Sequence, residues 1–224
     1  MNCFDADGAL PSVVSDEVAG GHAATRRLLD AGHRRIGFIN LDTGIPAAVG
    51  RRQGYDQALR EAGLDIDDSL VVPGHATADG GYAAACELLD RENGRPTALF
   101  CGNDRTAMGA YDAIKERGLR IPDDIAVIGS DNQELIAACL RPGLTTAALP
   151  FEAMGAKGVD MLGALTAGQP LGTTQMKAGC PLIERSSVRL RISLTTETHH
   201  TRGRIGVNVF GGRAAYQDTF VTAL

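Results

Sequence analysis

The sequence predicts an α/β protein built on a doubly wound parallel sheet. Short apolar runs recur near residues 36, 70, 97 and 125, about every thirty residues, with an amphipathic helical pattern between successive runs. This alternation is typical of a parallel sheet that carries helices on both faces. A chain of 224 residues is long enough for one large domain of this kind or two small ones, with a buried core.

The first predicted elements are a helix, a strand and a second helix. Residues 16–31 form the first helix, capped by Ser15 or Asp16 and stopped by Gly32. A strand over 36–41 follows, and a helix over about 47–62 ends at Gly63.

The middle of the chain repeats this pattern. A strand over 70–72 is cut off by Pro73, and the next helix is predicted to bury Tyr82, Ala85, Cys86 and Leu89. The following strand, helix and strand occupy 97–131. Apolar runs at 97–101 and 125–128 flank a helix with Asp104 predicted at its N-cap.

The last predicted elements are shorter or less regular. A short helix over 135–140 ends before Pro142, and Phe151 opens an amphipathic helix that stops at Gly168. Residues 181–184 look like a strand. The segment after residue 189 has no assigned structure, and its His199 and His200 lack further ligands at metal spacing.

Polar side chains follow two of the predicted strands. Asn103 and Asp104 come directly after the strand at 97–101, and Asp131 follows the strand at 125–128. Because ligands of open parallel sheets bind outside the carboxyl ends of the strands, these residues are candidates for a binding site. An amide and two carboxylates suit the vicinal hydroxyls of a polyol such as a sugar. Taken singly, Asp104 could be only a cap and Asp131 only a turn former.

Several motifs in this order resemble one protein family. They are GHRRIGFI at 32–39, RRQGYDQAL at 51–59, LFCGNDRTAMGAYDAIKERGLRIPDDIAVIGSDN at 99–132 and RPGLTT at 141–146. Together they resemble the effector-binding core of the lactose/galactose repressor (LacI/GalR) family of transcription regulators, over about residues 5–188. The resemblance implies the periplasmic-binding-protein-like type I fold, mainly its second subdomain. Ser130 departs from the family, which commonly has an aromatic residue there.

The resemblance implies two further ligand-binding residues. Arg51 matches the arginine of the family's R-x-x-G-[YF] motif, which donates hydrogen bonds to ligand hydroxyls. Phe151 matches a position that packs against the ligand from the far side of the cleft. Ala76 stands where the family often has an aromatic residue, so His75 is a candidate substitute. The predicted ligand-binding set is therefore Arg51, Asn103, Asp104, Asp131 and Phe151.

The resemblance also divides the chain into segments. Residues 1–15 are expected to be a remnant of the first subdomain, 16–146 the second subdomain, 147–170 the crossover helix of the first subdomain, 171–188 the return strand of the second subdomain and 189–224 a divergent tail. On this alignment the helix-turn-helix head and most of the first subdomain are expected to be absent.

The function implied is that of an effector sensor that controls the DNA binding of a head domain. A sugar or polyol is the expected effector, and a homodimer is expected, with Met108 and Leu140 at the subunit contact. The alternative is a solute-binding protein of a sugar transporter, which shares the fold but needs a secretory signal. No catalytic motif is present, so we expect neither an enzyme nor a cofactor nor a metal.

Composition narrows the possible partners. The net charge is −5 and the basic residues are scattered, so this chain itself is not expected to bind DNA specifically. The five cysteines are widely spaced and include no CxxC pair, which favours reduced thiols in a cytoplasmic protein. No run of 18 apolar residues occurs, so no membrane association is expected.

Overall fold

A computed structural model describes residues 10–42, 44–91 and 94–189 of the chain. Residues Met1–Arg189 form one compact unit, and Leu190–Leu224 form a second unit that lies outside the described residues. The predictions for the divergent tail, including His199 and His200, therefore lie outside the described part.

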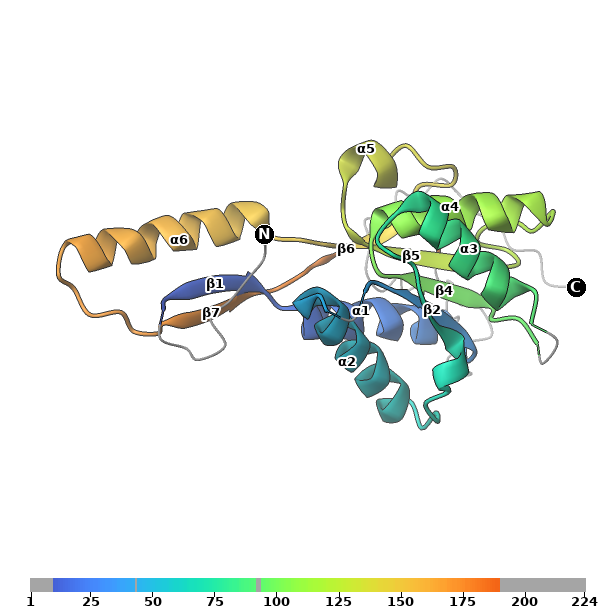
Figure 1. The fold of residues 1–224 in the computed structure, drawn as a ribbon, viewed down its shortest axis with the longest axis horizontal. Helices are drawn as coiled ribbons and strands as arrows, with labels where there is room; N and C mark the ends of the chain where they lie inside the picture. Colours follow the sequence, from blue (N-terminus) through green and yellow to red (C-terminus); the bar gives the residue numbers. More distant parts are fainter. Residues whose placement is uncertain (1–9, 43, 92–93, 190–224) are drawn as a thin grey trace, which may run out of the picture. The chain divides into compact units, whose positions relative to one another are not determined.

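The core of the described unit is a six-stranded sheet (Figure 1). Its strand order is β3-β2-β4-β5-β6-β8, and every neighbouring pair is parallel except β6 and β8. The strands are β2 (Ile36–Asn40), β3 (Val71–Pro73), β4 (Ala98–Cys101), β5 (Ala126–Asp131), β6 (Thr145–Ala148) and β8 (Leu182–Ile183). The predicted fold class, an α/β protein with a doubly wound parallel sheet, is confirmed.

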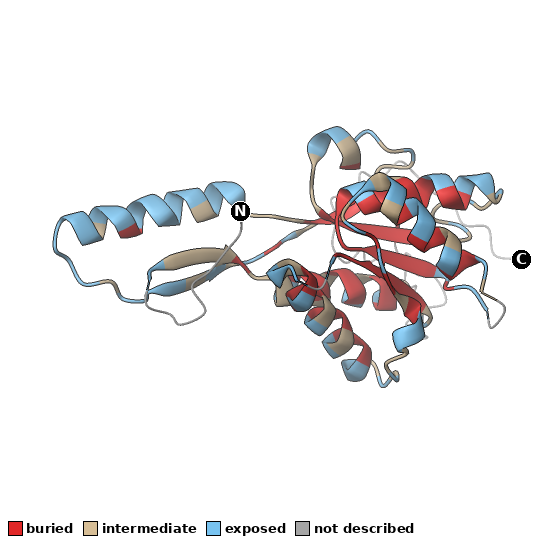
Figure 2. Ribbon diagram, viewed as in Figure 1, coloured by how far each residue is buried: buried red, intermediate tan, exposed pale blue. Residues whose placement is uncertain are grey.

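Helices cover both faces of this sheet. One face packs against α1 (Glu17–Asp30) and α2 (Pro46–Glu61), and the other packs against α3 (Ala78–Leu89) and α4 (Asp104–Glu116). Alternate residues of a strand serve the two faces: Phe38 lies in the core under α1 and α2, whereas Ile39 lies in the core under α3 and α4. Figure 2 shows the central strands and the inner helix faces as buried.

An aromatic stack fills the core under α1 and α2. The ring of Phe38 lies 4.6 Å from that of Phe100 and 5.2 Å from that of Tyr55, measured between centroids. The Tyr55 hydroxyl donates to the Ile36 carbonyl oxygen at 2.8 Å, so this buried polar group is satisfied. Burial raises the pKa of Tyr55 above its ordinary range.

Glycines bring the helices of each pair into close contact. A Cβ atom at Gly54 of α2 would overlap the backbone of Val18 and His22 in α1, and one at Gly109 of α4 would overlap the backbone of Ala78 in α3. Glycine therefore permits a closer helix approach than any other residue at these positions. The approach fixes which residues of α1 and α2 face each other, and this matters for the site described below.

A smaller layer adjoins the sheet in the described unit. Strands β1 (Ser12–Ser15) and β7 (Gln175–Ala178) pair in parallel, and α6 (Phe151–Thr166) contacts β1. Met161 is the only residue of α6 in the buried class, while Val159 is 70% exposed and Leu162 is 62% exposed. The helix is mostly exposed in Figure 2 (labelled α6 in Figure 1), so much of its apolar surface lacks cover from the described residues.

Two sequence predictions about helices were wrong in detail. Asn103, not Asp104, is the N-cap of α4, since its side chain accepts from the Thr106 backbone N–H at 2.8 Å. In α3 the predicted buried stripe is correct for Ala85 and Leu89 and wrong for its other two residues. Tyr82 is 37% exposed and Cys86 half-buried, because the face next to α4 is formed by Gly81, Ala84, Ala85, Leu88 and Leu89.

Two other predictions need correction. The short helix α5 spans Glu134–Ala137, so it ends three residues earlier than expected. The strands β1 and β7 were not predicted, and β7 pairs with β1 outside the six-stranded sheet. Only β8 of the expected return segment 171–188 joins that sheet, next to β6 and in the antiparallel direction.

Candidate ligand-binding site

The strand order of the sheet reverses between β2 and β4. Strand β3 lies on one side of β2, whereas β4, β5 and β6 follow on the other. The chain leaves the carboxyl end of β2 toward α2 and the carboxyl end of β4 toward α4. Such a switch point opens a crevice between the two loops and is the usual place for a ligand in this type of sheet. Arg51 of α2 and Asn103 after β4 come from these two connections.

Arg51 is the centre of the polar cluster at this point. Its Nε donates to Glu17 Oε2 at 2.8 Å, one terminal nitrogen donates to Asp131 Oδ1 at 3.1 Å and the other to the Gly102 carbonyl oxygen. Only 4% of the Arg51 side chain is exposed. One guanidinium thus connects α1, α2, β5 and the loop after β4. Three of its five N–H groups are used by these protein partners.

The contact between α1 and α2 places Glu17 beside Arg51. A Cβ at Gly21 would lie 2.5 Å from the Arg51 carbonyl oxygen, and one at Gly50 would lie 2.7 Å from Glu17 Cβ. Both helices therefore need glycine where they cross. Asp16 caps α1 by accepting from the Ala19 N–H at 3.1 Å, which fixes Glu17 in the first turn. Sequence analysis missed Glu17, because an acidic residue in a first turn is ordinary helix chemistry.

Asp131 ends β5 in an unusual backbone conformation. It has φ 101°, and Asn132 after it has φ 52°. Positive φ is uncommon in residues other than glycine and is often found at functional sites. Arg185 supports this turn by donating to Asn132 Oδ1 at 2.8 Å. Burial raises the pKa of Asp131, while the nearby Arg51 guanidinium acts in the opposite direction.

The oxygen and the nitrogen of the Asn103 side-chain amide each form a hydrogen bond with a backbone group. Its oxygen accepts from the Thr106 N–H at 2.8 Å, and its nitrogen donates to the Ala76 carbonyl oxygen at 3.2 Å. Ala76 and His75 both have positive φ. The amide therefore joins the start of α4 to the loop before α3. His75 is exposed, and its Nδ1 lies 2.8 Å from an Asp42 oxygen.

Asp104 lies behind the cluster and is fully buried. Its Oδ1 accepts from the Thr146 hydroxyl and its Oδ2 from the Gln133 backbone N–H, both at 2.7 Å. Burial raises the pKa of Asp104 to about 7, although these two hydrogen bonds act to lower it. The structure thus gives Asp104 no exposed surface and connects it to the ligand side through Gln133, whose side chain donates to Asp131 at 3.2 Å.

Phe151 stands apart from these four residues. It opens α6 and is 65% exposed, and it lines a shallow cavity of about 500 Å³ with its neighbours in the chain. Its connection to the cluster is through the backbone, since the Leu149 N–H donates to the Asp131 carbonyl oxygen at 3.4 Å. The structure therefore brings Arg51, Asn103, Asp104 and Asp131 into one region and leaves the Phe151 ring outside their hydrogen bonds.

A larger cavity reaches the cluster from another side. It has about 800 Å³ and lies between the first turns of α2 and the strands β1 and β7. Glu17 lines it, as do Ser15, Gly50, Gln53 and Lys177, with apolar side chains around them. Since Glu17 also binds Arg51, this carboxylate connects the cavity to the polar cluster.

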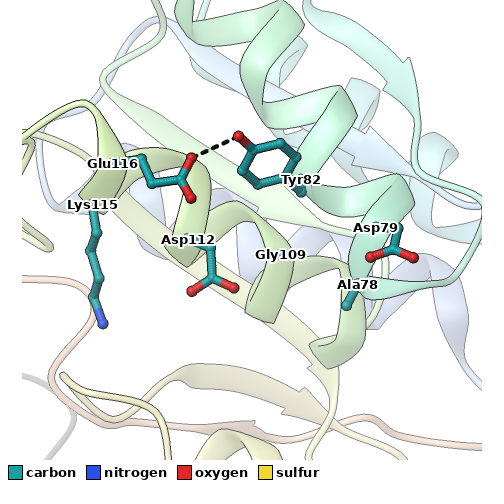
Figure 3. A pocket seen from close by; sticks show the side chains of 7 residues that line it. All are labelled: Ala78, Asp79, Tyr82, Gly109, Asp112, Lys115 and Glu116. Carbon is teal, nitrogen blue, oxygen red and sulfur yellow. Dashed lines mark hydrogen bonds between the residues drawn. The ribbon is translucent and has the colours of Figure 1, made fainter.

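A third cavity lies between α3 and α4. It has about 250 Å³, and acidic side chains of Asp79, Asp112 and Glu116 line it (Figure 3). The Tyr82 hydroxyl points at Glu116 and donates to it at 2.7 Å, which raises the pKa of Tyr82 to about 12. Among the described residues, no group of three or more histidine, cysteine or acidic side chains is placed to hold a metal ion.

Comparisons with known proteins identify the family of this chain. The family described as periplasmic binding protein-like domain matches residues 25–188. A LacI family transcriptional regulator from Mycobacterium smegmatis is 30% identical with a TM-score of 0.72, and the match covers 82% of this chain and 68% of that one. The chain belongs to the LacI family. The resemblance inferred from the sequence motifs is thereby confirmed.

Other LacI-family relatives give the extent of the match. The ribose operon repressor of Haemophilus influenzae is 40% identical over 150 residues, which cover 67% of this chain and 45% of that protein. The solved structure titled transcriptional regulator CelR-cellobiose complex is 35% identical with a TM-score of 0.73, covering 80% of this chain and 54% of that one. The chain thus spans about half the length of its curated relatives. These LacI-family relatives are transcription regulators, not enzymes.

Proposed function

We propose that this LacI-family chain is the effector-binding core of a transcription regulator and that its effector is a neutral, sugar-like polyol. The observation that carries the proposal is the Arg51 guanidinium paired with Asp131 at the switch point of the sheet. Such a pair offers hydrogen-bond donors and acceptors side by side, which is what adjacent hydroxyls require. The names of two relatives, a ribose operon repressor and a cellobiose complex, support the same class of ligand.

In this proposal Arg51 donates to ligand hydroxyls and Asp131 accepts from them. Asn103 contributes from the loop after β4, and Phe151 packs against the ligand from α6. Asp104 supports these residues from behind, because both oxygens of its carboxylate already accept hydrogen bonds from the protein. Each of these side chains except Phe151 is held by hydrogen bonds, so little ordering is needed on binding.

Binding is proposed to regulate DNA binding by a separate head domain, within a homodimer in the cytoplasm. Met108 and Leu140 are the proposed subunit contacts. Met108 is half-buried on α4, and Leu140 packs in part against the core. The division of the chain into 16–146 and 171–188 as one subdomain, with 147–170 in the other, belongs to the same proposal. A transporter's solute-binding protein is the less supported alternative, because the relatives reported above are transcription regulators.

No described helix is both long enough and apolar enough to cross a membrane.

Calorimetry with a panel of neutral mono- and disaccharides tests the proposed effector. We expect one or more sugars to bind with at best millimolar affinity, on the order of −4 kcal/mol, because Arg51 is largely covered and one wall supplies most of the hydrogen bonds. Arg51→Ala and Asp131→Ala should each weaken binding at least about tenfold, since a hydrogen bond to a charged group contributes roughly 1.5–3 kcal/mol.

The matched control is Arg52→Ala. Arg52 is the next residue on α2 and pairs with Asp56 at 2.7 Å on the outer side, so its loss should leave sugar binding unchanged. Thermal unfolding shows whether each variant is folded. Equal sugar binding by folded Arg51→Ala, Asp131→Ala and unaltered protein would place the site elsewhere.

A further inference from the structure

The guanidinium of the proposed site already has two carboxylate partners. Glu17 pairs with Arg51 Nε at 2.8 Å and Asp131 pairs with a terminal nitrogen at 3.1 Å. Only 11% of the Glu17 side chain and 16% of the Asp131 side chain are exposed. Because water screens such partly buried groups poorly, their charges act on whatever approaches Arg51. The three side chains together carry a net charge of about −1.

Within the described residues, the charges of three neighbouring side chains bear on this balance. Asp104 lies behind Asp131 and adds a further carboxyl group whose pKa, about 7, keeps it partly ionised at neutral pH. Arg185 acts to lower the pKa of Asp104, and its guanidinium donates to Asn132 and to the Leu144 carbonyl oxygen, each at 2.8 Å. Lys177 lines the 800 Å³ cavity on the exposed strand β7. The polar cluster therefore presents more acceptors and negative charge than free cationic donors.

Glu17 is the carboxylate that a ligand in the large cavity would meet. It lines this cavity, and its second oxygen accepts from the Ser15 hydroxyl at 2.6 Å. A ligand hydroxyl in this cavity can donate to Glu17, whose other oxygen pairs with Arg51. A phosphate carries one to two negative charges at neutral pH, so it gains from Arg51 but is repelled by both carboxylates.

We propose that Glu17 sets the ligand charge that this site accepts, so that neutral hydroxyl-bearing ligands bind and phosphorylated or other anionic ones are rejected. This inference rests on the proposed function, because it concerns the specificity of the same site. It adds a specificity-determining residue on α1, outside the predicted ligand-binding set.

The substitution Glu17→Gln tests the inference, with inorganic phosphate as the anionic probe. Glutamine keeps the size of the side chain and an acceptor for Arg51 but removes the charge. In calorimetric titrations at pH 7.5 and constant ionic strength, Glu17→Gln should bind phosphate at least about tenfold more tightly than the unaltered chain. The double variant Glu17→Gln/Arg51→Ala should lose this gain, since the anion would bind at Arg51.

Glu87→Gln is the matched control. Glu87 also pairs with an arginine, Arg91, at 2.8 Å, but on the exposed face of α3. Its substitution changes the net charge by the same amount and should leave phosphate binding unaltered. Equal phosphate affinity in Glu17→Gln and the unaltered chain, or an equal gain in Glu87→Gln, would overturn the inference.

A comparison that needs no variant covers the case in which Glu17→Gln fails to fold. The unaltered chain should bind a neutral sugar at least about tenfold more tightly than its phosphate, with ribose and ribose 5-phosphate or glucose and glucose 6-phosphate as pairs. Tighter binding of either sugar phosphate would contradict the role of Glu17. If no sugar binds but Glu17→Gln gains phosphate binding through Arg51, the proposed effector class is wrong while the role of Glu17 stands.

Discussion

Asp104 shows how one residue serves both the fold and the site. It starts α4 behind the N-cap, and its carboxylate binds the start of α5 through Gln133 and β6 through Thr146. A Cβ at Gly129 of β5 would overlap Asp104 Oδ1, so the strand needs glycine to admit this buried carboxyl group. The ionised form is disfavoured there by desolvation, and this raises the pKa from 3.8 to about 7.

The raised pKa predicts how Asp104 affects stability as pH changes. The folded chain holds the proton more tightly than the unfolded chain, so the contribution is fully present below about pH 4 and is lost as pH rises through about 7. Denaturant unfolding of Asp104→Asn, which cannot ionise, should show its stability rising relative to the unaltered chain over this window, by up to roughly 4 kcal/mol. Asp112→Asn, an exposed change on the same helix, is the matched control for the substitution itself. A constant difference for Asp104→Asn would mean that Asp104 does not titrate in this window.

The residues of the proposed site were only partly predictable from the sequence. Arg51, Asn103, Asp104 and Asp131 were proposed because they follow strands or match a motif. The sequence does not reveal that Asn103 and not Asp104 is the N-cap of α4, because the two residues are adjacent and both residue types are good N-caps. Glu17 and Gln133 were missed because their importance depends on which helices and strands come together.

At the scale of elements, glycines allow α1 to pack closely on α2 and α3 on α4. This close packing determines which side chains of the paired helices meet. Helix α1 approaches α2 so closely that Glu17 reaches Arg51, and α3 approaches α4 in the same manner. Strand and helix positions were predicted well because the apolar periodicity of each is local. The strands β1 and β7 were missed because each has only four residues and neither is mostly buried.

Gly54→Ala tests the importance of close packing between α1 and α2. The added methyl group would overlap the Val18 and His22 backbone, so the helices must separate, and we expect a loss of about 1–3 kcal/mol in the free energy of unfolding. Gly158→Ala in α6 is the control, since nothing lies within 4 Å of its Cβ. That change should stabilise the chain by roughly 0.5–1 kcal/mol through helix propensity. Chemical denaturation measures both, and a neutral or stabilising Gly54→Ala would show that the helices adjust freely.

At the scale of the whole molecule, the family and the doubly wound sheet followed from the sequence, because motif order and strand rhythm extend over most of the chain. The pairing of β8 with β6 in the antiparallel direction did not follow, since strand direction depends on where the chain returns. The exposed apolar residues of α6 are a further feature that periodicity alone does not reveal.

Sedimentation of the unaltered chain and of Met108→Asp tests the proposed homodimer. We expect the unaltered chain to form dimers and Met108→Asp to raise the dimer dissociation constant at least about tenfold, since a charge buried in an interface lacks a partner. Val159→Asp places the same charge on the exposed surface of α6, where the residue is 70% exposed, and should leave the dimer intact. A monomer in every case would remove Met108 and Leu140 from the proposal.

The pairing of β1 with β7 also has a consequence for synthesis of the chain. The Ser12 hydroxyl donates to the Gln175 side chain across a separation of 163 residues. During translation β1 leaves the ribosome before every strand of the six-stranded sheet, yet its partner emerges after β6. At ordinary elongation rates β1 waits on the order of ten seconds with an unpaired edge. A strand of four residues with serine at both ends is a poor template for wrong pairing, so its shortness protects the nascent chain from aggregation.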